Sequence, residues 1–168
     1  MFIQYNKLVS MSRPIVFLDV DGVLHPFHGH LSQVTTFHAA CMNELARIVE
    51  AINAEIVLSS SWRNFASTRD KVQANLNQFG MSYSRWIEAD SSNKNPSAMK
   101  LQKILAFVQA HHPPDWIVLD DEDLIGESGV DPLSMMAQLF ASRFVQTNPA
   151  TGLTGDDAGK AIDIINSR

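Results

Sequence analysis

Three short strand-like runs, each followed at once by polar residues, most constrain how this chain can fold. The runs are Ile15–Leu18, Glu55–Leu58 and Trp116–Leu119, and they lead into Asp19, "SSS" and "DDED". Segments with the apolar spacing of amphipathic helices lie between them. Strands that alternate with helices predict a parallel sheet covered on both faces, which binds ligands beyond the carboxyl ends of its strands. We therefore expect an α/β fold with its functional groups at that edge.

The helical patterns account for much of the remaining chain. They predict helices over roughly His38–Asn53, before Gly80, between "NPS" and "HHPP", around Met135–Phe140, and after a capping pair formed by Thr154 and Asp157. Further short strands are expected at Phe144–Gln146 and within Met81–Ile87. Because we find no internal repeat, low-complexity tract or linker, we expect one domain over residues 1–168. The ten residues before Met11 show no clear period, and we expect residues 1–12 to be disordered or extra to the domain.

The composition excludes several classes of protein. With 168 residues, 45% apolar and 18% charged, the chain has the composition of a globular domain with a full core. A net charge of −5 argues against a broad surface for nucleic acid or anionic membranes. The single cysteine, Cys41, precludes an internal disulfide and fits a reducing compartment. We found no apolar stretch long enough for a signal peptide or a membrane span, so we expect a cytoplasmic protein without membrane contact.

Acidic residues dominate two of the three strand ends. Asp19 and Asp21 are two residues apart, and side chains at that spacing on an extended chain share a face, so their carboxylates would lie close together. Asp120, Asp121 and Asp123 would join them if the strands are neighbours. Such a cluster is electrostatically unfavourable without a cation, and carboxylates without nearby His or Cys ligands favour Mg²⁺. An EF-hand does not fit, because it needs glycine at loop position 6 and glutamate at position 12.

A magnesium ion held by acids suits phosphoryl transfer. One aspartate can attack phosphorus to give an acyl phosphate, and a second can protonate the leaving oxygen and then activate water. The phosphoryl oxygens also need hydrogen-bond donors and a cation. Candidates for substrate binding in "LSSSWR" are the hydroxyls of Ser59, Ser60 and Ser61 and the guanidinium of Arg63.

The order of these motifs, "hhhhDxDGV … hhhSSSWR … Lys … hhhhDD", resembles the haloacid dehalogenase (HAD) superfamily over almost the whole chain from Ile15. The tail "FVQTNPATGLTGDDAGKAIDII" and the "LSSSWR" strand end are similar to a narrower group, the HAD domains of Swiss Army Knife RNA repair proteins. The resemblance implies a Rossmann-like three-layer sandwich with a parallel central sheet. It also implies a Mg²⁺-dependent phosphatase.

The resemblance assigns roles to individual residues. Asp19 would be the nucleophile that accepts the phosphoryl group, and Asp21 the general acid/base. Mg²⁺ would be held by Asp19, by the main-chain carbonyl of Asp21, and by Asp120 or Asp121. Ser59 would contact the phosphoryl group.

Two of these roles have alternatives. If the register resembles that of polynucleotide phosphatases, whose arginine lies two residues after the serine, the serine role falls to Ser61 together with Arg63. For the catalytic lysine we favour Lys100, near the start of its helix, over Lys94 and Lys103.

The spacing of the motifs leaves no room for a large cap domain. Asp19 and Ser59 are 40 residues apart, Ser59 and Lys100 are 41 apart, and the expected helices fill most of both gaps. Within the HAD superfamily, a site without a cap implies an open cleft that admits bulky phosphates. The loop "HPFHGHLSQ" would be a minimal flap over it. Further candidates for substrate contact are Trp62, Arg63, His25, His28 and His30.

We therefore expect a phosphomonoesterase whose partner is a phosphorylated substrate, either a nucleotide or a nucleic-acid end. The alternative is a non-catalytic HAD-fold module that binds phosphate or a protein. The presence of Asp21 argues against the alternative, because binding alone has no need of a second acid.

Overall fold

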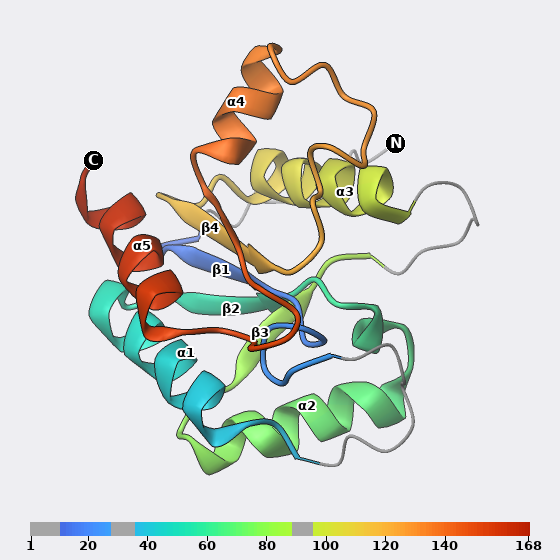
Figure 1. Cartoon of the computed structure of the whole chain (residues 1–168). Coiled ribbons are helices and arrows are strands. Elements are labelled where there is room, and N and C mark those ends of the chain that lie inside the picture. Colours follow the sequence, from blue (N-terminus) through green and yellow to red (C-terminus); the bar gives the residue numbers. More distant parts are fainter. Residues whose placement is uncertain (1–10, 28–35, 89–95) are drawn as a thin grey trace, which may run out of the picture.

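A five-stranded parallel sheet forms the centre of the molecule (Figure 1). In this computed structural model the described residues are 11–27, 36–88 and 96–168. The strands are β1 (Ile15–Leu18), β2 (Glu55–Leu58), β3 (Tyr83–Trp86), β4 (Trp116–Asp120) and β5 (Phe144–Gln146). Their order across the sheet is β3-β2-β1-β4-β5, and every neighbouring pair is parallel. The chain therefore winds outward in both directions from β1, which makes the end of β1 the topological switch point.

Helices cover both faces of the sheet. They are α1 (Ala39–Ile52), the 3₁₀ helix η1 (Ser61–Asn64), α2 (Ala66–Gln78), α3 (Pro96–His111), α4 (Met135–Ala141) and α5 (Gly155–Asn166). In Figure 1, α3 and α4 lie above the sheet, while α1, α2 and α5 lie on the opposite side. The α/β, Rossmann-like three-layer prediction is confirmed.

Two apolar cores result from the alternation of side chains along the central strands. Val16 and Leu18 of β1 pack into the core shared with α1, α2 and α5. Ile15 and Phe17 point to the other face and pack into the core shared with α3 and α4. A strand covered on both faces must be apolar at every position, which explains the unbroken run that begins the first motif.

Local sequence signals set the helix ends. Asn53 ends α1 in the left-handed conformation with φ 49°, a region that asparagine tolerates better than most residues. Thr154 and Asp157 form the expected capping box at the start of α5, each side chain accepting from the other residue's main-chain N–H.

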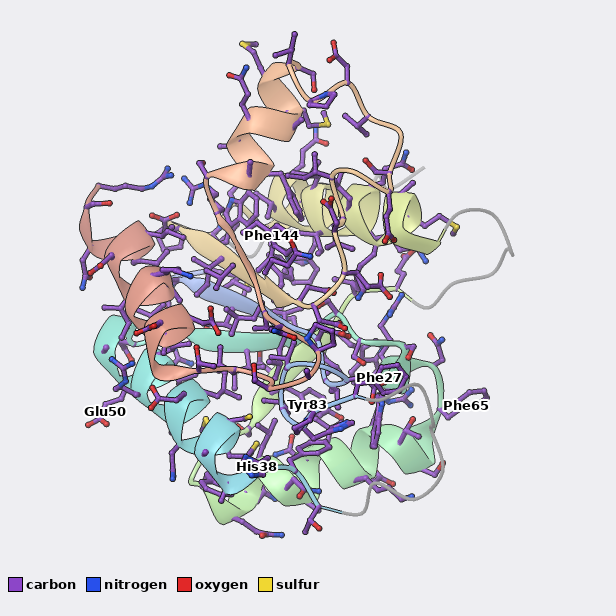
Figure 2. All side chains as sticks on the ribbon, viewed as in Figure 1. Phe27, His38, Glu50, Phe65, Tyr83 and Phe144 are labelled. Atoms are coloured by element: carbon purple, nitrogen blue, oxygen red, sulfur yellow. The ribbon has the colours of Figure 1, made fainter. Side chains whose placement is uncertain are left out.

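Helix α4 forms where it was predicted, but its apolar residues are not core residues as a group. Phe140 is buried and its ring lies 5.6 Å from that of Phe144 (labelled in Figure 2), whereas Met135 is 87% exposed. Met136 and Leu139 are also exposed. Only one side of this short helix meets the sheet, so the other side stays in solvent.

The N-terminal segment and the connections between strands can be compared with the sequence-based expectations. Met11, expected to be disordered or extra, is buried and its main-chain N–H donates to the His111 carbonyl at 3.3 Å. Residues 1–10, His28, His30 and Lys94 lie outside the described residues. Within the described ranges, no folded unit other than η1 and α2 is inserted between β1 and α1 or between β2 and β3. No helix in these ranges is long and apolar enough to cross a membrane.

Candidate active site

The register of the sheet brings three motif residues side by side. Leu18 of β1 pairs with Leu58 of β2 and with Leu119 of β4. Asp19 and Ser59 come directly after β1 and β2, and Asp120 is the last residue of β4, so the three residues lie side by side at one edge. The main-chain N–H of Asp19 donates to the Leu119 carbonyl at 3.0 Å, and that of Ser59 donates to the Leu18 carbonyl at 2.9 Å. Asp19 thus lies between the serine motif and the acidic motif.

Three carboxyl groups meet at this edge. Asp19, Asp120 and Asp121 each offer an oxygen, and these oxygens lie within 4.8 Å of one another. Gly22 allows the close approach of the third acid, because a Cβ at this position would lie 2.5 Å from Cγ of Asp121. The φ of Gly22 is +68°, a conformation that side chains other than glycine rarely adopt. Glycine is therefore required at this position of "DVDG" for two reasons: a Cβ would clash with Asp121, and the backbone has a positive φ.

Lys100 supplies positive charge to the acids. Its Nζ lies 2.7 Å from Oδ2 of Asp120 and 3.5 Å from Oδ1 of Asp19. Burial lowers the pKa of Lys100, but the negative charges of Asp19 and Asp120 raise it by more than burial lowers it. The pKa of Lys100 therefore lies well above its ordinary value. The amine is therefore charged at neutral pH. Lys103, by contrast, donates to the main-chain carbonyl of Glu88 at 3.2 Å and its bond is exposed to solvent.

Asp120 and Asp121 hold protons more readily than free aspartate does. Burial raises the pKa of Asp120 well above its ordinary value, and the charge of Asp19 raises it further, against the opposing effect of Lys100. The pKa of Asp121 is raised to about 6, chiefly by burial and to a smaller extent by the charge of Asp19. When all three are ionised, these carboxyls carry more negative charge than Lys100 offsets. A divalent cation would relieve this excess, and three converging carboxylate oxygens are a donor set that suits Mg²⁺.

The three serines occupy different environments. The hydroxyl of Ser59 is fully buried, and no hydrogen-bond partner for it exists among the described residues. Ser60 Oγ accepts from the main-chain N–H of Trp62 at 3.3 Å and caps η1. Ser61 is exposed. A buried hydroxyl without a partner is costly, so Ser59 is the serine best suited to receive a ligand oxygen.

Arg63 points into the protein. It is 1% exposed, and Nη1 donates to the carbonyls of Ser59 and Ser60, each at 2.8 Å. Its Nε donates to the carbonyl of Glu88 at 3.2 Å. These bonds tie the loop after β2 to the loop after β3, and the binding of substrate by Arg63 stays a prediction.

The side chain of Asp21 does not join the three clustered acids. β1 ends at Leu18, and a turn through Gly22 brings Leu24 N–H to 2.8 Å from the Val20 carbonyl. The extended spacing assumed for Asp19 and Asp21 therefore does not hold. Asp123 is also absent from the cluster, because its Oδ1 accepts from the main-chain N–H of Gly126 at 2.9 Å.

The Asp21 carboxyl is instead bound by two aromatic side chains. His25 Nε2 lies 2.9 Å from Oδ1, and Trp62 Nε1 donates to Oδ2 at 2.9 Å. Burial lowers the pKa of His25, but its hydrogen bonds to Asp21 and Pro26 and the charge of Asp21 raise it above 6.5 overall.

A family model describing the HAD domain in Swiss Army Knife RNA repair proteins matches residues 15–158. The chain belongs to this family. The match extends from the first residue of β1 into α5, so it contains every candidate site residue. Among solved structures, a "putative had-like phosphatase" from Mesorhizobium loti superposes with a TM-score of 0.56 at 14% identity, covering 95% of this chain and 89% of that one. At that identity the likeness shows the fold. No curated protein matched the chain.

This HAD domain therefore has the predicted family and fold, and both support the expectation of a phosphatase. The partners of Asp21 were missed from the sequence, where His25 and Trp62 were considered only as candidates for substrate contact. The one available signal was that His25 comes four residues after Asp21, across a glycine turn. Nothing in the sequence indicated that Trp62, 41 residues away, would reach the same carboxyl.

A cavity of about 600 Å³ lies elsewhere on this HAD domain, between β3 and α3. Its walls include Arg85, Ile87, Lys103 and Phe107, and the described residues that line it include none of the acids or serines above. The candidate chemistry of this HAD domain thus lies at the strand ends and not in this cavity.

Proposed function

We propose that this HAD domain is a Mg²⁺-dependent phosphomonoesterase that works through an aspartyl-phosphate on Asp19. The observation that carries the proposal is the position of Asp19, beside a charged buried lysine, two further carboxyls and the Ser59 hydroxyl, which has no hydrogen-bond partner among the described residues. A site for simple binding of phosphate would gain nothing from three acids, because they repel the ligand unless a metal offsets them.

The described residues suggest how a magnesium ion would be held. Both oxygens of Asp120 already have partners, since Oδ2 meets Lys100 and Oδ1 accepts from the Glu122 main-chain N–H at 3.1 Å. We therefore assign the metal chiefly to Asp19 and Asp121, with Asp120 nearby and the main-chain carbonyl of Asp21 as a further ligand. When bound, Mg²⁺ offsets the charge of the carboxylates and of the phosphoryl group, so that an anion can approach an anion.

The side chains divide the reaction between them. A carboxylate oxygen of Asp19 attacks phosphorus, the ester P–O bond breaks, and protonated Asp21 gives its proton to the leaving oxygen. Asp21 then takes a proton from water as the water oxygen attacks the phosphorus of the acyl phosphate. The bond between phosphorus and Asp19 breaks, inorganic phosphate is released, and both acids return to their starting states.

Ser59 and Lys100 would stabilise the reacting groups. The Ser59 hydroxyl would donate to a phosphoryl oxygen, a partner that no residue in the described ranges provides. The Lys100 amine, held by Asp19 and Asp120, lies beside the nucleophile and would offset negative charge that develops on the phosphoryl group.

The substrate we propose is a phosphomonoester of a nucleotide or a nucleic-acid end. The family's description connects these domains with RNA repair, and within the described ranges no inserted domain covers the strand ends. The alternative, a non-catalytic module for phosphate or protein, is less well supported, because it leaves the Asp21 carboxyl and its two partners without a role. We also propose a cytoplasmic location, in keeping with the single, buried Cys41.

A panel of phosphomonoesters with Mg²⁺ tests the proposal. It should contain an aryl phosphate, nucleotides, and oligonucleotides phosphorylated at the 5′ or 3′ end. Asp19→Asn should abolish phosphate release, while Asp163→Asn, at an exposed position of α5, should leave it unchanged. If the wild-type protein releases no phosphate from any member, the enzyme proposal is wrong and the binding module is favoured.

A further inference from the structure

The carboxyl of Asp21 is held at both oxygens by side chains from two different strand ends. His25 contacts Oδ1 and Trp62 contacts Oδ2, each at 2.9 Å, and the two contacts together fix the plane of the carboxyl group. His25 itself is only 5% exposed. We call His25 and Trp62 the carboxyl clamp.

The clamp forms because two turns leave neighbouring strands at the same edge. The turn after β1 brings His25 back to Asp21, four residues earlier, and the two residues form a β-bridge. Trp62 comes from η1, directly after β2, where Ser60 caps its main-chain N–H. The pairing of β1 with β2 therefore sets the distance between the two halves of the clamp.

A buried aromatic ring keeps both clamp residues in place. The ring of Phe37 stacks on His25 with centroids 5.9 Å apart and meets Trp62 edge-on at 5.6 Å. The main-chain N–H of Phe37 donates to Oδ1 of Asn75 at 3.1 Å, and Asn75 is itself buried on α2. Such packing restricts the rotamers of His25 and Trp62, which is how a supporting layer gives a reacting group one orientation.

We propose that His25 and Trp62 are positioning residues that orient the Asp21 carboxyl for proton transfer to the leaving oxygen and from the attacking water. This inference rests on the proposed phosphatase reaction. Each carboxylate oxygen has two lone pairs and the clamp engages one on each oxygen, so Asp21 keeps a site at which it can exchange a proton. Neither clamp residue needs to touch the substrate.

A positioning role predicts a dependence on the leaving group. A 2,4-dinitrophenolate departs without a proton, whereas the alkoxide of an alkyl phosphate needs one from Asp21. Trp62→Phe keeps an aromatic ring at this position, smaller than the indole, but removes the N–H donor. We expect it to lower kcat/KM for an alkyl phosphate by about tenfold or more, and for 2,4-dinitrophenyl phosphate by less than about threefold. A residue that merely supports the fold would change both values by the same factor.

Trp86→Phe is the matched control, because it removes the same N–H from a Trp on β3 whose ring lies under Arg69. It should not change the ratio of the two kcat/KM values. His25→Gln and His25→Leu test the other half of the clamp, and we expect the amide of Gln to restore part of the alkyl phosphate activity that Leu loses. These two variants decide the question if Trp62→Phe does not fold.

The outcomes separate the two proposals. If the wild-type protein cleaves neither ester nor any member of the phosphomonoester panel, the proposed function is wrong and the clamp loses its role with it. If the wild-type protein cleaves both esters but the clamp variants lose equal factors on each, the phosphatase proposal stands and the positioning role is overturned. A selective loss on the alkyl ester supports the positioning role.

Discussion

Removal of the buried lysine charge is the perturbation whose effect follows most directly from the structure. In Lys100→Met, Asp120 loses a partner 2.7 Å away while staying fully buried, and Asp19 loses a partner at 3.5 Å. Loss of one member of a buried ion pair typically costs about 3–5 kcal/mol, because the remaining charge is left without compensation. We expect a loss of this size in the free energy of unfolding at pH 8 without metal.

The loss should depend on pH in a defined direction. Burial already raises the pKa of Asp120, and removal of Lys100 takes away the cation that opposes this shift. A carboxyl whose folded pKa exceeds its unfolded value binds protons more tightly when folded, so stability falls as pH rises from about 4 towards the folded pKa. The difference between wild-type and Lys100→Met should therefore be smaller at pH 5 than at pH 8.

Urea unfolding in EDTA at pH 5 and pH 8, followed by tryptophan fluorescence, measures the loss in the free energy of unfolding and its dependence on pH. Lys103→Met is the control, since this lysine lies on the same helix but makes its bond to Glu88 at the exposed surface. We expect the control to change stability by less than about 1 kcal/mol. A Lys100→Met protein as stable as the control at pH 8, or a difference that does not grow between pH 5 and pH 8, would refute the reasoning.

Three further predictions concern the turn, the metal and a helix end. Gly22→Ala should lower stability by about 1–3 kcal/mol in chemical denaturation and remove most activity, because its Cβ would lie 2.5 Å from the Asp121 carboxyl at a φ of +68°. Since the pKa of Asp121 is about 6, protons compete with Mg²⁺ below that pH, and Mg²⁺ should raise the melting temperature more at pH 7.5 than at pH 5. An equal shift at both pH values would contradict the assignment of Asp121 as a ligand. Thr154→Ala should cost about 1 kcal/mol of stability through the lost capping box and leave kcat unchanged in the phosphate-release assay.

Local patterns were sufficient to predict the sheet and the meeting of its strand ends. The runs before Asp19, Ser59 and Asp120 form adjacent strands, and β4 extends only one residue beyond its predicted end. Parallel strands present their carboxyl ends at a common edge, so residues that follow them converge whatever lies between. The prediction that Lys100 lies near the acids had a similar basis. A helix that connects two parallel strands begins at the carboxyl edge of the sheet, and Lys100 lies near the start of such a helix, α3.

Side-chain direction was not predictable in the same way. The i, i+2 rule for Asp19 and Asp21 assumes extended chain, and β1 already ends at Leu18, before either aspartate. The contact between Trp62 and Asp21 depends on how two loops pack, which no local spacing encodes. Helix α4 shows the same limit, since its apolar spacing predicted a helix but not that Met135 would stay in solvent.

The central claim is that Asp19 carries the phosphoryl group during turnover. Wild-type protein mixed with a ³²P-labelled phosphomonoester and Mg²⁺ should, after rapid acid quench, carry a covalent label that hydroxylamine removes and that maps to the peptide containing Asp19. Asp19→Asn should show neither label nor phosphate release. Turnover by Asp19→Asn at the wild-type rate, or a label on another residue such as Ser59, would contradict the account.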